Sequence, residues 1–129
     1  MCIQRTIDQC ASRHPTAFLA TGSESESSAQ AEKGDWATRL PLLIVMGDAD
    51  DWTPATPCKT PAAANPDSVK LILYPGAYHD FDNEAQTLHE LHGLALTANG
   101  DGVAHAGLNP AARAAALKDV PDFLAVLKQ

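Results

Sequence analysis

The feature that most constrains the fold is an unbroken apolar run near the middle of the chain, "LPLLIVMG" at residues 40–47. Its apolar side chains do not alternate with polar ones, which is typical of a strand covered on both faces, as in a parallel sheet. A second such run predicts a strand over about 69–74, stopped by Pro75 and Gly76. About twenty residues separate the two runs, which suits the crossover that a parallel pair requires. The sequence therefore predicts an α/β fold with strand 41–47 parallel to strand 69–74.

Helix and turn signals surround these two strands. The proline- and alanine-rich segment between them predicts a short, broken helix near 55–64. Near the C-terminus, Asn109 suits an N-cap and Pro110 suits the first helical position, so we expect a helix over 110–128. One face of that helix carries apolar residues that we expect to pack on the sheet: Leu117, Val120, Leu124 and Leu127.

The turn motif "NGDG" at residues 99–102 has short strand-like stretches on either side. Asn and Gly both tolerate positive φ, so Asn-Gly is a strong hairpin signal. We therefore expect a small hairpin between the second strand and the C-terminal helix.

Composition sets the domain organisation. A chain of 129 residues, 45% of them hydrophobic, is expected to hold one domain. Residues 21–35, "TGSESESSAQAEKGD", contain no apolar side chain larger than that of alanine. Such a segment buries too little surface to offset its ordering entropy, so we predict a divergent N-terminal segment and flexible linker over 1–35.

Charge and apolar patterning exclude several function classes. The formal net charge is −7 and Lys/Arg do not cluster, so nucleic acid and anionic membrane are not expected partners. No apolar run is long enough to span a bilayer, and charged residues interrupt the first twenty positions, so we expect neither a membrane span nor an export signal. The three cysteines form no CxxC pair, which favours thiols in a reducing, cytoplasmic setting over a disulfide framework.

Titratable residues gather where each predicted strand ends. Asp48, Asp50 and Asp51 follow the first strand, and His79 and Asp80 follow the second. Functional residues of parallel α/β sheets collect beyond the C-terminal ends of the strands, so we expect these loops to meet. A carboxylate that orients an imidazole is the base-plus-orienter half of a nucleophilic triad.

Three segments carry a family resemblance: "PLLIVMGDADDWTPATPC", "YPGAYHDFD" and "NPAARAAALKDVPDFLAVL". They resemble the C-terminal half of dienelactone hydrolase family proteins of the α/β-hydrolase superfamily. The three segments occur in the family's order, and the resemblance covers roughly residues 34–129. It implies a partial α/β-hydrolase fold over 36–129, with a short parallel sheet flanked by helices and a small hairpin.

The resemblance also assigns roles to two residues. In the family, the acid lies three residues after the glycine that closes its strand, which corresponds to Asp50. The family histidine lies in a stretch similar to "YPGAYHDF", which corresponds to His79. Residues 51–54 then resemble the turn that supports the acid. Asp48 and Asp51 are expected to be solvated turn residues, with Asp51 the next candidate for the acid.

The chain departs from the family at the nucleophile. The family places a cysteine or serine on a G-x-C-x-G or G-x-S-x-G elbow upstream of the acid. No such motif occurs in the 129 residues, and none of Cys2, Cys10 and Cys58 has flanking glycines. The resemblance thus implies a carboxylic ester hydrolase acting on small ester or lactone substrates, with His79 as base and Asp50 orienting it. Because the nucleophile elbow is absent, we expect this chain to be inactive alone. The alternative is a non-catalytic, truncated hydrolase fragment that self-associates or binds a partner through an exposed sheet edge.

The motif "HELH" at residues 89–92 is similar to a metal-binding pattern. The zinc-protease motif H-E-x-x-H spaces its histidines at i and i+4, whereas these are at i and i+3. His105 is the nearest further ligand, and it reaches them only if the hairpin folds back. We therefore expect polar loop histidines here, with no metal and no cofactor.

Overall fold

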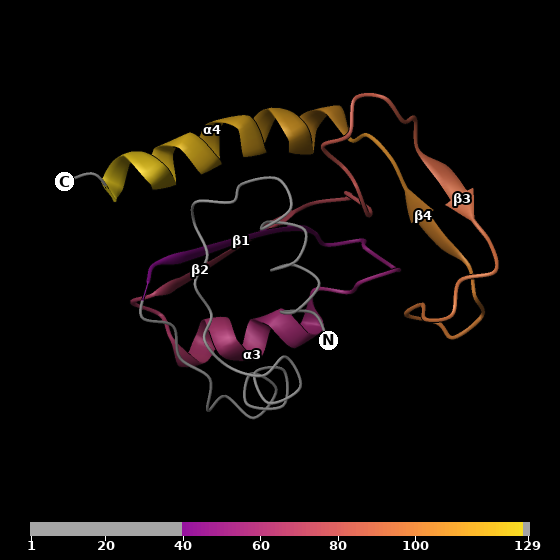
Figure 1. Ribbon diagram of the computed structural model, residues 1–129, viewed down its shortest axis with the longest axis horizontal. Coiled ribbons are helices and arrows are strands. Elements are labelled where there is room, and N and C mark those ends of the chain that lie inside the picture. Colours follow the sequence, from indigo (N-terminus) through magenta and orange to yellow (C-terminus); the bar gives the residue numbers. More distant parts are fainter. Residues whose placement is uncertain (1–39, 128–129) are drawn as a thin grey trace. The chain divides into compact units, whose positions relative to one another are not determined.

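The computed structural model describes residues 40–127. Along the chain these residues form strand β1 (Leu42–Gly47), helix α3 (Thr56–Ala64), strands β2 (Val69–Tyr74), β3 (His89–Leu91) and β4 (Ala104–Ala106), and helix α4 (Pro110–Val126) (Figure 1). The predicted segment and linker over 1–35 lies outside the described residues.

Strands β1 and β2 form a two-stranded parallel sheet (Figure 1). The Leu42 N–H donates to the Ser68 carbonyl at 2.7 Å, and the Asp48 N–H donates to the Tyr74 carbonyl at 3.1 Å. Both bonds join residues with the same separation in sequence, which occurs only when two strands run in the same direction. The predicted parallel pair is confirmed, with each strand within one residue of its expected bounds.

The chain divides into two compact units. Among the described residues, the first contains residues 40–44 and 56–71, and the second contains residues 45–55 and 72–127. In the first unit, α3 lies where the short helix was predicted and buries the side chains of Cys58 and Pro61. Cys58 is disulfide-bonded, so the expectation of a thiol is wrong for this residue.

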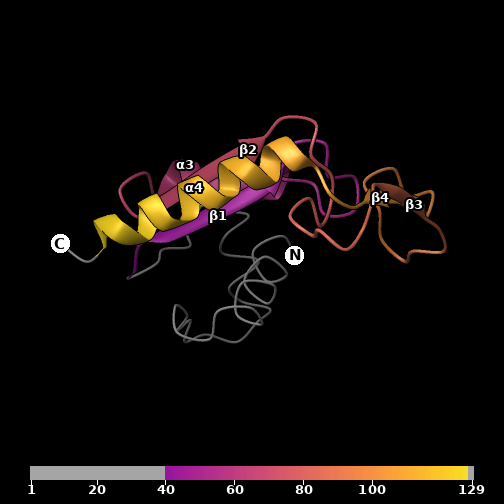
Figure 2. The same cartoon turned by 90° about the horizontal axis from the view of Figure 1, so that it is seen from above.

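The second unit is built around two aromatic rings and a small-residue face of α4. Tyr74 and Phe81 pack edge to face with ring centroids 5.2 Å apart. The buried cluster around them consists of Tyr74, Ala77, Phe81, Ala112 and Ala116. Helix α4 and strands β1 and β2 can be followed in a second view in Figure 2. The Tyr74 hydroxyl donates to Asp119 Oδ2 at 3.1 Å and so ties the end of β2 to the helix.

Helix α4 begins as predicted but packs through a different face. The Asn109 side chain accepts a hydrogen bond from the Ala112 N–H at 3.1 Å, and Pro110 occupies the first turn. The predicted leucine face is wrong, because Leu117 is 59% exposed and Leu124 and Leu127 are each 46% exposed. The Tyr74 and Phe81 rings fill most of the space between the strands and the helix. The helix can therefore approach them only through small side chains such as alanine.

The predicted hairpin is present, with its first strand earlier than expected. Strand β3 pairs antiparallel with β4, and Glu90 lies opposite His105. The stretch "LALT", which precedes "NGDG" in the sequence, belongs to the connection, where Thr97 Oγ1 donates to Asp101 Oδ1 at 3.2 Å. His89 and Glu90 are therefore strand residues rather than loop residues. The bond between Thr97 and Asp101 lies within a local turn over residues 94–103, and the pairing of β3 with β4 begins only outside this turn.

Within residues 40–127, the elements are thus mixed: one parallel pair, one antiparallel pair and two helices. None of the helices described is both long enough and apolar enough to cross a membrane.

Candidate active site

The ends of β1 and β2 are brought together by a glycine and an aspartate. A β-carbon at Gly47 would lie only 2.0 Å from the Ala77 carbonyl oxygen, so the loop after β2 passes where another residue's side chain would be. The Ala49 N–H donates to that same carbonyl at 3.1 Å. Asp48 is exposed, as expected of a turn residue, but its Oδ1 accepts from the Gly76 N–H at 2.7 Å. Asp48 therefore joins the two loops.

Asp50 and His79 contact each other across these loops. His79 Nδ1 lies 3.0 Å from Asp50 Oδ2, and the two side chains are 11% and 6% exposed. The contact predicted between these two residues is therefore confirmed. Asp50 is the one charged residue among residues 40–127 that is buried, so its carboxylate must be compensated by hydrogen bonds.

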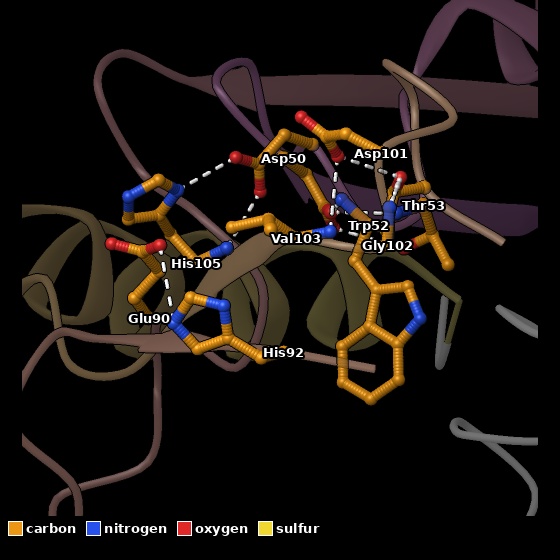
Figure 3. A network of polar contacts seen from close by, with 11 residues as sticks. Asp50, Trp52, Thr53, Glu90, His92, Asp101, Gly102, Val103 and His105 are labelled. Atoms are coloured by element: carbon orange, nitrogen blue, oxygen red, sulfur yellow. Dashed lines mark hydrogen bonds and ion pairs between the residues drawn. The ribbon is translucent and has the colours of Figure 1, made fainter. Parts of the chain in front are cut away.

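The residues that follow Asp50 supply this compensation. Asp50 Oδ1 accepts from the Trp52 N–H at 3.0 Å and from the Thr53 N–H at 2.7 Å. Thr53 Oγ1 donates to Asp50 Oδ2 at 2.9 Å and lies 3.1 Å from His79 Nδ1. Figure 3 shows Trp52 and Thr53 beside Asp50 in this network. An aspartate that bonds the backbone two and three residues ahead forms a rigid local turn, so the carboxylate is fixed before it meets the imidazole.

The imidazole of His79 is also held by its surroundings. The Trp52 ring lies against it, with centroids 4.7 Å apart and planes tilted by 49°. The next residue, Asp80, has a φ of 55°. A positive φ is uncommon for a residue with a side chain, although aspartate tolerates it better than most. The chain thus turns sharply just after His79.

A second aspartate–histidine pair lies next to the first. Asp51 Oδ2 is 2.7 Å from His105 Nδ1, and Asp51 Oδ1 accepts from the His105 N–H at 2.8 Å. The hydrogen bond to Asp51 is the main cause of the raised pKa of His105. The sequence did not predict this pair, and Asp51 is not simply the solvated turn residue that was expected. The sequence signal that could have indicated this pair was the predicted hairpin, because the hairpin determines where His105 lies.

The other candidate residues have separate partners. His89 Nδ1 lies 2.8 Å from the Thr87 carbonyl, and His92 Nε2 lies 3.3 Å from Glu90 Oε1 (Figure 3). Among the described residues, no three His, Cys, Asp or Glu side chains are grouped so that they could hold a metal ion. Cys58 is fully buried and disulfide-bonded, so this residue does not present a nucleophilic thiolate.

The Asp50–Thr53–His79 arrangement is suited to proton transfer. A carboxylate at Nδ1 favours the tautomer with its proton on that nitrogen and the lone pair on Nε2. It also stabilises the imidazolium formed when Nε2 accepts a proton.

No protein-family model matches the chain, and comparisons with curated proteins and with solved structures find no similar protein.

Proposed function

We propose that this chain carries the acid–base half of an ester or lactone hydrolase of the dienelactone hydrolase type. His79 is the general base and Asp50 is the residue that orients it. The observation that supports this assignment is the 3.0 Å contact between His79 Nδ1 and Asp50 Oδ2, made by an aspartate that is itself buried. The residues in contact are the two that the family resemblance selects.

The chemistry follows from the tautomer. With its proton on Nδ1 and bonded to Asp50, His79 accepts a proton at Nε2 from an attacking hydroxyl, thiol or water. The nucleophile attacks the ester carbonyl, and the imidazolium then returns the proton to the departing alkoxide. Such a cycle needs no metal or cofactor, and its substrate is a small ester or lactone.

The nucleophile is the part that the 129 residues do not identify. No strand-to-helix elbow motif occurs in the sequence, and the oxyanion hole of such enzymes uses the backbone N–H that follows the nucleophile. Removing one oxyanion donor alone costs on the order of 10²–10³ in turnover. The chain by itself is therefore expected to hydrolyse esters only weakly, with His79 activating water.

A hydrolysis assay on the full chain tests the proposal. We expect a slow release of nitrophenol from p-nitrophenyl acetate that is lost in His79→Ala and retained in the control His92→Ala, whose imidazole is exposed. Labelling with a fluorophosphonate and with iodoacetamide, read by mass spectrometry, identifies any activated serine or cysteine. A rate identical in both histidine variants, or a rapid rate traced to a labelled cysteine, contradicts the assignment.

A second candidate function is a non-catalytic interaction module, and two observations favour it. Within residues 40–127, β1 and β2 form a sheet of two strands only, so each has an edge without a further described strand. Such edges are templates for pairing with another chain. In addition, α4 exposes the leucines that were expected to be buried.

Light scattering at several concentrations distinguishes this candidate. If α4 mediates self-association, Leu124→Glu lowers the apparent mass. The control is Leu96→Glu, because Leu96 is similarly exposed, at 49% against 46%, but lies in the hairpin connection. If the chain is monomeric at all concentrations, self-association is ruled out. If both substitutions lower the apparent mass equally, a specific role of α4 is ruled out.

A further inference from the structure

The consecutive residues Asp50 and Asp51 each hold a histidine from a different segment. Asp50 contacts His79 after β2, whereas Asp51 contacts His105 on β4. Asp51 makes both its side-chain contacts with a single residue, one to the His105 backbone N–H and one to the imidazole. This pair plays no part in the proton transfer proposed above.

Strand β4 is linked to His79 as well as to Asp51. The Gly107 N–H, just after β4, donates to the His79 carbonyl at 2.8 Å, and His79 forms a parallel bridge with Ala106. The Asp51 carbonyl accepts from the Ala98 N–H at 2.7 Å, so the hairpin connection is bound to the same turn. The hairpin therefore contacts the turn that carries Asp50 and also the backbone that carries His79.

We propose that Asp51 and His105 are a positioning pair, which fastens the β3–β4 hairpin to the turn carrying Asp50 and thereby fixes the backbone of His79 opposite that acid. The catalytic consequence rests on the function proposed above, while the mechanical link between the two pairs does not. When the Asp51–His105 contact is lost, the hairpin loosens and the Gly107–His79 bond opens more often.

The charged groups around His105 determine how this link depends on pH. Asp51 contacts it from the acid turn, and Glu90 lies opposite it on β3, paired in turn with His92. The Tyr78 ring lies 4.9 Å from the imidazole. Two carboxylates favour the protonated form, in agreement with the raised pKa of His105. Its contribution is therefore complete below the unfolded-state pKa, about 6.5, and is lost as pH rises through the folded-state pKa.

Hydrogen exchange measured by NMR on the full chain tests the proposal. The probes are the Gly107 amide and the Nδ1 proton of His79, both corrected for intrinsic exchange at each pH. In His105→Ala we expect both to exchange about three- to tenfold faster, which is the effect of one hydrogen bond. In His105→Asn, whose amide nitrogen replaces Nδ1, we expect protection to recover. In the control His92→Ala we expect no change.

The pH series separates a positioning role from general stability. Protection of Gly107 in the unmodified chain should fall as pH rises through the titration of His105, and this dependence should be absent in His105→Asn. If His105→Ala does not fold, Asp51→Asn provides the same test with a smaller change. Unchanged exchange in these variants overturns the proposal, even where ester hydrolysis still depends on His79. Faster exchange supports it, even where the chain hydrolyses no ester.

Discussion

The approach of the two loops at Gly47 is the part of the structure most sensitive to a single methyl group. In Gly47→Ala the new β-carbon would lie 2.0 Å from the Ala77 oxygen and 2.5 Å from the Ala77 carbonyl carbon. Both are backbone atoms, so no side chain can rotate away from them. Since real contacts of this kind essentially never fall below 3.0 Å, the loop must move by about 1 Å or more.

The cost has two parts. Overpacking a closely packed site typically costs about 1–3 kcal/mol. The same movement stretches the bond from the Ala49 N–H to the Ala77 carbonyl, worth about 0.5–1.5 kcal/mol. Together, these two costs lead us to expect that Gly47→Ala lowers the free energy of unfolding by about 2–4 kcal/mol. Because Ala77 lies two residues before His79, we also expect the contact between Asp50 and His79 to lengthen.

Urea denaturation measures the first effect, and the NMR signal of the His79 Nδ1 proton measures the second. Gly100→Ala is the matched control, because Gly100 has a φ of 72° but no atom lies within 4 Å of the position that a β-carbon would take there. Its cost is the left-handed backbone alone, about 1–2 kcal/mol, with the His79 signal unchanged. A Gly47→Ala protein as stable as the original, with an unaltered His79 signal, would refute this reasoning.

Three further substitutions test individual contacts. Thr53→Val removes the hydroxyl that bonds Asp50 and should cost about 1–3 kcal/mol in urea denaturation, whereas Thr53→Ser should retain most of the stability; equal losses would contradict the role of the hydroxyl. Asp80→Ala should cost about 1 kcal/mol because of its φ of 55°, and Asp80→Asn should cost less; the reverse order would count against backbone strain. Burial, followed by the bond to a carboxylate, raises the pKa of Tyr74 to about 12, so its stabilising effect is complete below the unfolded-state pKa of 10.0 and is lost towards pH 12. Ultraviolet titration should show this late ionisation, and Tyr74→Phe should remove it.

The parallel pair and the N-cap of α4 were predictable because their signals are local. An unalternating apolar run defines a covered strand, and Asn109 followed by Pro110 defines a helix start. The packing face of α4 was not predictable from periodicity alone. Leucines satisfy the helical pattern, but the rings of Tyr74 and Phe81 leave room only for alanines.

The candidate site, like the fold, was predictable only in part. Two strands with a known direction bring Asp50 and His79 to one edge, so their contact followed from sequence and resemblance. The partner of Asp51 did not follow, because the position of His105 depends on a hairpin whose strands are only three residues long. Short strands carry too little pattern for their register to be predicted.

The tautomer of His79 tests the central claim most directly, since proton transfer through Nε2 requires the resting proton to be on Nδ1. ¹⁵N chemical shifts of the imidazole, recorded on the full chain at a pH where the ring is neutral, identify the protonated nitrogen. We predict the proton on Nδ1 in the unmodified chain and a mixture of tautomers in Asp50→Ala. A proton on Nε2, or the same tautomer mixture with and without Asp50, would contradict the account.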